Sequence, residues 1–331
     1  MLARRGLHVC LALFLFSAAQ AFAVKELRMG SPWPTATILH VGAAEFVKEV
    51  DKLSKGQLKI NLYPDAQLGD IQALVTSTQT GTVDLVFLGP GNASVLKGGQ
   101  ALNVVYVPYL FKTRDVVESI LNGPLFQPIY EELAKQSNVR IFGCYGARLP
   151  RGLLTVKGPI VKPSDLKGMK MRTPPIELMR ATWEKLGAKP VIMGMSDIYL
   201  SISRGQVDGQ ENGLDAIIGF KWYEVAKFYS NTDHVFDTAA YYANEKLWQS
   251  LSAGERDVLV QAAKNAGATL TKAMTAYEKE AIDILKKHGV TITQPDQAAF
   301  RETVKDLYKD KKYEGKLWPE GFADRIRAAQ N

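Results

Sequence analysis

The sequence predicts an α/β protein built as two lobes that share one long helix. Three observations lead to this fold class. The chain has 331 residues, more than a single hydrophobic core comfortably holds. Segments with strand and helix patterns alternate through both halves, as in sheets covered by helices. A helical pattern then runs over 253–288 without a proline, long enough to form a backbone shared by two lobes.

The first residues have the pattern of a signal peptide. Arg4 and Arg5 precede an apolar run over 9–16, and a stretch of small residues ends at Ala23. This run is far shorter than the roughly 20 apolar residues that span a bilayer, and the Ala-x-Ala ending suits signal peptidase. We therefore predict a signal peptide over 1–23 and an exported, soluble mature protein.

The N-terminal half of the mature chain alternates strands and helices in the order of a parallel sheet. Residues 26–30 read as a short strand, and apolar residues over 38–53 recur at helical spacing. Alternating apolar residues predict a strand over 58–62. A helix over 71–80 and an apolar strand over 83–88 follow.

The second half repeats this style with different sequences. Its predicted helices and strands are short and separated by Gly or Pro. We expect strands over 139–144 and 190–193, a turn followed by a strand over 166–172, and a short strand that runs into a polar turn over 207–213. Helices are expected over 176–186, 196–204 and 253–288.

Composition and motifs argue against several functional classes. The net charge of +7 is scattered along the chain, which favours solvated helix faces over nucleic-acid binding. The sequence has no H-E-x-x-H motif, no paired cysteines for a metal, no G-x-S-x-G elbow and no phosphate-binding or dinucleotide-binding loop. We therefore expect no metal, no cofactor and no catalytic residues.

Polar residues at predicted strand ends are the candidates for a binding site, because ligands of open α/β sheets sit at the carboxyl ends of strands. Arg172 ends a strand just before two prolines, and Asn212 lies in a polar turn. A guanidinium matches a carboxylate through two parallel hydrogen bonds. From spacing alone, a surface salt bridge explains Arg172 equally well, and a turn-forming role explains Asn212 better.

The segment from Asp165 to Leu214 contains D-L-K-G-M-K-M-R, L-G-A-K-P and S-D-I-Y-L-S-I-S-R-G-Q-V-D-G-Q-E-N-G-L. It resembles the central signature of the solute-binding proteins of TRAP transporters, the DctP-like (C4-dicarboxylate-binding) family. The resemblance covers nearly the whole mature chain in order. Its other parts are Y-P-D-A-Q-L-G-D from Tyr63, Q-T-G-T-V-D-L from Gln79, V-P-Y-L-F from Val107, and Y-E-V from Tyr223 with the later His234.

This resemblance implies a two-lobe periplasmic binding protein fold. The lobes are joined by hinge strands, crossed by one long helix, and close on a ligand. On this basis we expect lobe I to comprise 24–147 and 238–277, and lobe II to comprise 148–237 and 278–331.

The resemblance also implies roles for individual residues. Arg172 matches the arginine that pairs with the ligand carboxylate, and Asn212 matches a ligand-contacting asparagine. Arg151 matches a second arginine of the site, and Arg148 is a close rival for that role. Met195 stands where many relatives carry phenylalanine.

Lobe I offers three further candidates, each near the end of a predicted strand. Trp33 could pack on the ligand body, although tryptophans between prolines are as often structural. Gln67 and Asn92 could bind hydroxyl groups of a sugar acid.

The resemblance therefore predicts a periplasmic, monomeric protein that captures a small organic acid: a dicarboxylate, a sugar acid or a related carboxylate. It would deliver this acid to the small and large membrane subunits of a TRAP transporter. Two alternatives remain open: a periplasmic α/β enzyme acting on a carboxylate, and a ligand-binding partner of a sensor kinase.

Overall fold

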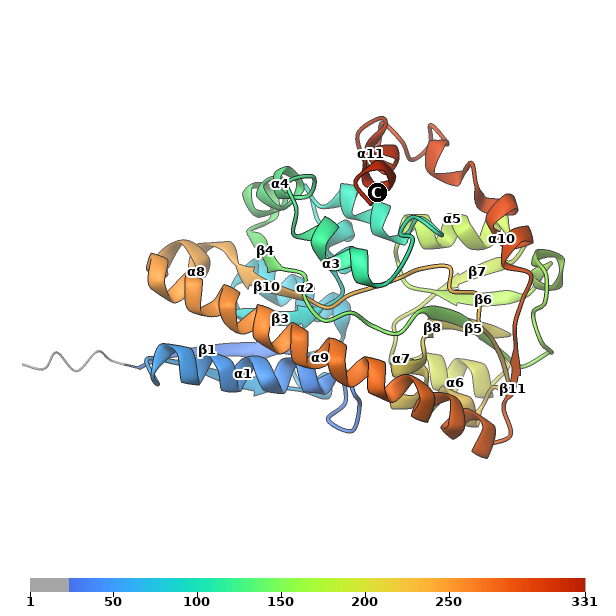
Figure 1. Ribbon diagram of the computed structural model, residues 1–331, viewed down its shortest axis with the longest axis horizontal. Coiled ribbons are helices and arrows are strands. Elements are labelled where there is room, and N and C mark those ends of the chain that lie inside the picture. Colours follow the sequence, from blue (N-terminus) through green and yellow to red (C-terminus); the bar gives the residue numbers. More distant parts are fainter. Residues whose placement is uncertain (1–23, 331) are drawn as a thin grey trace, which may run out of the picture.

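The computed structural model describes residues 24–330, so the predicted signal peptide over 1–23 lies outside the described residues. Two β-sheets with their helices lie side by side and form two lobes (Figure 1). This confirms the predicted fold class. Across 24–330, no helix combines the length and the apolar character needed to cross a membrane.

The first sheet has five strands and carries the N-terminal half of the chain. Its three leading strands pair in parallel, as predicted, whereas its last two come from later segments and one of them runs antiparallel to its neighbours. The order across the sheet is β2 (Leu58–Tyr63), β1 (Lys25–Gly30), β3 (Leu85–Leu88), β10 (Ala240–Asn244) and β4 (Val139–Gly143).

The second sheet has six strands and mixes both directions. Strand β5 is antiparallel to its two neighbours, whereas β6 is parallel to both of its own. The order across the sheet is β11 (Thr291–Thr293), β9 (Phe228–Ser230), β5 (Arg151–Thr155), β8 (Gly209–Gly213), β6 (Lys170–Thr173) and β7 (Lys189–Ile192). The residue Asn212 therefore lies in a strand and not in a turn.

Ten helices besides the long one cover the sheets within residues 24–330, and those predicted from periodicity form within a few residues of their expected ends. Aspartate and glycine caps explain one such match: the Asp70 side chain accepts a hydrogen bond from Ala73 N, and Gly81 ends the same helix with φ +80°. The helices are α1 (His40–Ser54), α2 (Ile71–Thr80), α3 (Asp115–Leu121), α4 (Gln127–Ser137), α5 (Glu177–Lys185), α6 (Ile198–Ser203), α7 (Leu214–Gly219), α8 (Glu245–Ser250), α10 (Gln297–Val304) and α11 (Phe322–Ala328).

The long helix α9 (Ala253–Lys287) runs across both lobes (Figure 1). It begins at a capping box in which Ser252 and Glu255 satisfy each other's backbone N–H groups. Its first half packs along α1 of lobe I, and its second half reaches α7 and β11 of lobe II. The proline-free stretch therefore forms the shared backbone that its length predicts.

Two segments cross between the sheets and lie side by side. One precedes β5 over 144–150, and the other precedes β10 over 231–239. Arg148 N donates to Asp237 O at 3.1 Å, Arg151 N donates to Val235 O at 3.1 Å, and Ala147 forms an antiparallel bridge with Thr238. We call these the crossing segments. They bring charged side chains to the junction of the lobes.

The C-terminal end contacts lobe I. The Phe322 ring of α11 lies 5.4 Å from that of Phe126, and Gln330 Nε2 donates to Leu110 O at 3.1 Å. The predicted division places 278–331 in lobe II. That division stays a prediction, and the structure adds that its last segment packs against the other lobe.

Candidate ligand-binding site

A pocket lies between the lobes, where the crossing segments meet the ends of β6 and β8. Its space, which is partly open to solvent, measures about 390 Å³. Its polar lining comprises Arg148, Arg151, Arg172, Asn92, Asn212 and Asp237. Its apolar lining includes Trp33, Ile71, Tyr106, Ile176, Met179 and Met195.

Arg172, on β6, is only 4% exposed but has no carboxylate partner among residues 24–330. Its Nε and Nη2 donate to the carbonyl oxygen of Met193, at 3.2 and 3.1 Å. Since a guanidinium carries five N–H donors, the Nη1 end remains available to the pocket. Burial lowers the pKa of Arg172 to about 10, so the side chain stays charged at neutral pH.

Arg151, at the start of β5, has its charge neutralised inside the protein. Its Nε and Nη2 donate to both carboxylate oxygens of Glu211, at 2.6 and 2.7 Å, and its Nη1 donates to Asp237 Oδ2 at 3.2 Å. Burial works against the charge of Arg151, but the Glu211 carboxylate outweighs it and raises the pKa of Arg151. Burial alone would raise the pKa of Glu211, yet the Arg151 charge and hydrogen bonds hold it well below its usual range.

Arg148, on the first crossing segment, is neutralised in the same way. Its Nε donates to Asp215 Oδ2 at 2.7 Å, its Nη1 donates to Asp237 Oδ2 at 3.3 Å, and its Nη2 donates to Asn212 Oδ1 at 3.1 Å. The guanidinium also lies 5.0 Å from the centre of the Trp33 ring. Arg148 and Arg151 therefore both hold Asp237 and tie the crossing segments together.

Asn212, on β8, faces the pocket with its amide nitrogen unused. Its Oδ1 accepts hydrogen bonds from Arg148 Nη2 and from Gly213 N, both at 3.1 Å. Within the described part of the chain, Asn212 Nδ2 has no partner. Asn212 and Arg172 therefore offer the pocket N–H groups, which suits an anionic or carbonyl-bearing ligand.

The charges of the three arginines equal in number those of the carboxylates around them. Arg148, Arg151 and Arg172 carry three positive charges, and the salt bridges of the first two involve three carboxylates, those of Glu211, Asp215 and Asp237. Within residues 24–330, no group of three or more His, Cys, Asp or Glu side chains is arranged to hold a metal ion.

The sequence profile of a family described as "Bacterial extracellular solute-binding protein, family 7" (DctP) matches residues 29–315. The chain belongs to this family. It is a periplasmic solute-binding protein of the TRAP type, as its central signature predicts.

Relatives and solved structures agree with this assignment. This solute-binding protein is 30% identical over 302 residues to the sialic acid-binding periplasmic protein SiaP of Vibrio cholerae, covering 90% of this chain and 92% of the relative. It is 28% identical over 307 residues to the 2,3-diketo-L-gulonate-binding periplasmic protein YiaO of Escherichia coli, covering 91% and 92%. A TRAP periplasmic solute-binding protein of Roseobacter denitrificans with bound L-galactonate is 27% identical, with a TM-score of 0.84, covering 92% of this chain and 99% of that one.

The structure brings together most of the residues predicted for the site of this solute-binding protein. Seven of the eight candidates line the pocket: Arg172, Asn212, Arg151, Arg148, Met195, Trp33 and Asn92. Gln67 does not, because its side chain is exposed on the loop after β2. Arg148 and Arg151 both line the pocket, so the lining does not choose between them as the second arginine of the site. Their salt bridges, however, leave Arg172 as the arginine with a free end.

Four residues around the pocket were not found from the sequence. Glu211, Asp215 and Asp237 neutralise the paired arginines, and Tyr106 lines the lobe I side. Glu211 stands beside Asn212 in the D-G-Q-E-N signature, so the motif offered a signal for it. Asp237 and Tyr106 have no such signal, because only the fold brings them to the arginines.

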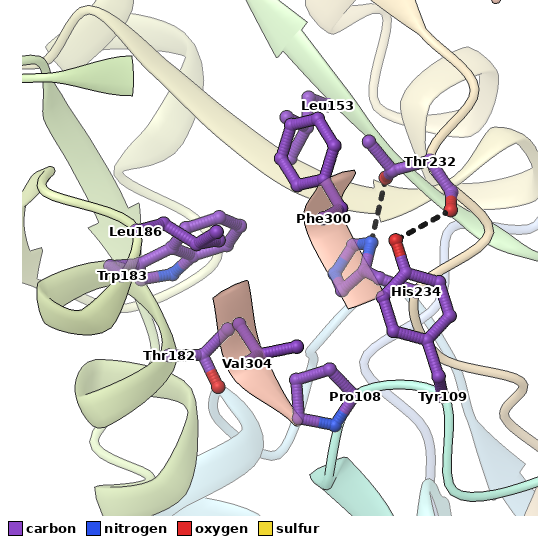
Figure 2. Close-up of a pocket in the computed structure, with 10 residues that line it drawn as sticks. All are labelled: Pro108, Tyr109, Leu153, Thr182, Trp183, Leu186, Thr232, His234, Phe300 and Val304. Atoms are coloured by element: carbon purple, nitrogen blue, oxygen red, sulfur yellow. Dashed lines mark hydrogen bonds between the residues drawn. The ribbon is translucent and has the colours of Figure 1, made fainter. Parts of the chain in front are cut away.

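A second cavity, lined mainly by apolar side chains, lies beside His234 and Trp183 (Figure 2). His234 lies at its edge, with Nδ1 at 2.8 Å from Thr232 Oγ1 and Nε2 at 3.4 Å from Glu211 Oε2. The Trp183 ring packs against His234 edge-on at 6.0 Å. This cavity lacks an arginine, so it does not suit a carboxylate as the first pocket does.

Proposed function

We propose that this protein captures a small organic acid through Arg172 and delivers it to TRAP membrane subunits. The observation that carries the proposal is the guanidinium of Arg172, which is buried but unpaired among residues 24–330. A buried charge without a partner is costly, and a ligand carboxylate supplies that partner. The acids bound by the relatives named above agree with an organic acid as ligand.

The remaining predicted residues take supporting roles in this proposal. Asn212 Nδ2 donates to the ligand next to its carboxylate, and Trp33, Met195 and Asn92 enclose the ligand body. Arg148 and Arg151 contribute positive potential and keep the crossing segments in place rather than gripping the carboxylate themselves.

The lobes close around the ligand in this proposal, using the crossing segments as a hinge. Lobe I comprises 24–147 and 238–277, and lobe II comprises 148–237 and 278–331. The lining supports closure, because Trp33 and Asn92 come from lobe I whereas Arg172 and Met195 come from lobe II. The membrane subunits would recognise the closed form of the protein. The protein acts as a monomer in this proposal.

We also propose that the protein is not an enzyme. Catalysis on an acid needs a group that exchanges a proton at working pH, whereas the pocket lining is dominated by arginines and apolar side chains. The one carboxylate of the lining, that of Asp237, is held by Arg148 and Arg151, and His234 contacts Glu211 and lines the second cavity instead.

Binding measurements test the proposal. The acid that co-purifies with residues 24–331 is identified by mass spectrometry, and its affinity is measured by calorimetry. Because truncation leaves a desolvated carboxylate unpaired, Arg172→Ala is expected to weaken binding at least about a hundredfold. Arg172→Lys should recover only part of the lost affinity, because a lysine ammonium group cannot donate two parallel hydrogen bonds to one carboxylate.

The partly exposed Arg180 of α5, which is not among the residues that line the pocket, supplies the matched control, and Arg180→Ala should bind like the parent. Equal affinity of Arg172→Lys and the parent would contradict the two parallel hydrogen bonds between Arg172 and the ligand carboxylate. Conversion of the acid during incubation over hours would contradict the non-enzymatic role.

A further inference from the structure

One arginine of the pocket lining, Arg172, has no carboxylate partner among residues 24–330, so a ligand carboxylate finds one unpaired cation there. The carboxylates of Glu211, Asp215 and Asp237 already neutralise Arg148 and Arg151. Only the Arg172 end is left for a ligand. A second ligand carboxylate would be buried without a cation of its own, and buried unpaired charges are strongly unfavourable.

The uncharged polar groups of the pocket are also few. Asn212 has one free amide nitrogen, because its oxygen is shared by Arg148 and Gly213. Asn92 has one free oxygen, because its Nδ2 donates to Gly89 O at 3.0 Å. The hydroxyl of Tyr106 is the third such group. A ligand with several hydroxyls needs a donor and an acceptor for each, which this set does not provide.

Apolar side chains from both lobes line a part of the pocket. Ile176 and Met179 belong to the segment around the start of α5, and Met195 precedes α6; these three are 3%, 4% and 7% exposed. Ile71, at the start of α2, and Trp33 line the pocket from lobe I. A ligand held at Arg172 therefore projects its body into an apolar enclosure.

We infer that the ligand is a short monocarboxylate with a compact, apolar, branched body and at most a hydroxyl or oxo group beside the carboxylate. The inference rests on the proposed function and narrows its ligand class. It separates this chain from relatives that bind polyhydroxylated acids such as L-galactonate. The observations that carry it are the single unpaired guanidinium, the few free polar groups and the apolar enclosure.

Three acids of similar size provide a direct test: 2-hydroxy-3-methylbutanoate, D-erythronate and succinate. Calorimetry on residues 24–331, dialysed to remove co-purified ligand, gives the three affinities. Because unmatched hydroxyls and a second charge lose hydration without replacement, we expect D-erythronate to bind at least about tenfold more weakly than the branched acid. Succinate is expected to bind at least about a hundredfold more weakly.

Two variants replace an apolar side chain of the lining by a polar one of nearly the same shape. In Met179→Gln and Met195→Gln, an amide replaces the thioether, so the branched acid should lose about tenfold in affinity while D-erythronate loses less or gains. Leu200→Gln, an exposed position of α6, is the matched control and should leave all three affinities unchanged. Thermal melts verify that each variant is folded.

The outcomes distinguish the two proposals. Binding of D-erythronate or succinate as tight as that of the branched acid, and lost in Arg172→Ala, overturns this inference but keeps the proposed function. Failure of all three acids to bind overturns this inference alone, whereas a co-purified acid whose binding does not depend on Arg172 overturns the proposed function and this inference with it. A Met195→Gln variant that keeps the parent's preference contradicts the role of the apolar enclosure.

Discussion

Arg151 and Arg172 line the same pocket and are almost equally buried, but their charges are balanced in different ways. Arg151 is held by two internal carboxylates, those of Glu211 and Asp237. Arg172 contacts only a carbonyl oxygen, that of Met193, within residues 24–330. The difference shows how one pocket can contain both structural and ligand-directed arginines, and why residue type and burial alone do not separate the two.

The largest expected effect is loss of stability on neutralising the paired arginine. Arg151→Met leaves Glu211 as an uncompensated buried charge, so the free energy of unfolding should fall by about 3–5 kcal/mol. Urea denaturation measures the change. The double variant Arg151→Met, Glu211→Gln should recover much of it, because the pair is then removed together.

Arg180→Met is the control for this change, since Arg180 pairs with exposed glutamates on α5 and surface pairs contribute at most about 1 kcal/mol. A loss for Arg151→Met no greater than for Arg180→Met would contradict the structural role of the buried pair.

The unpaired arginine should behave in the opposite way. Arg172→Met removes a buried charge that no internal carboxylate stabilises, so the free energy of unfolding without ligand should stay within about 1 kcal/mol of the parent or rise. The same denaturation series measures it. A loss comparable to that of Arg151→Met would mean that Arg172 is also structural.

The crossing segments, which carry Arg148 and Asp237, are expected to bend when ligand arrives. Solution scattering should record a smaller radius of gyration at saturation, with no change in molecular mass, because the lobes close on the ligand. Arg172→Ala, which cannot recruit the carboxylate, should show no compaction at the same ligand concentration. An unchanged radius for the parent would argue against a hinge.

The smallest expected effect is that of pH. Arg172, with a pKa of about 10, stays charged at neutral pH. The lowered pKa of Glu211 means that its stabilising contribution is complete above its ordinary pKa and is lost only as pH falls through the lower folded value. Affinity between pH 6 and 8 should therefore change by less than about twofold, because the ligand carboxylate is ionised throughout.

Calorimetry at three pH values tests this expectation, and free energies of unfolding over the same range should be equally flat. A marked change in affinity that disappears in His234→Gln would contradict it, since His234 contacts Glu211.

Much of the fold could be predicted from the sequence, because the patterns that specify it are local. Apolar residues at helical spacing predicted α1 and the long α9, and alternation predicted β2, each within a few residues of its observed ends. The direction of β10 was not predictable in this way, because strand pairing depends on contacts between distant segments.

The candidate site shows the same difference between what local sequence patterns predict and what only the fold decides. Sequence alone placed Arg172 at a strand end and Asn212 in a polar turn, and the family resemblance assigned both to the ligand site. Only the tertiary structure decided that Arg148 pairs with Asp215 and Asp237, and that Arg151 pairs with Glu211 and Asp237. The partners lie more than 50 residues apart in sequence. Charge pairing depends on distances set by the whole fold, and no spacing along the chain encodes those distances.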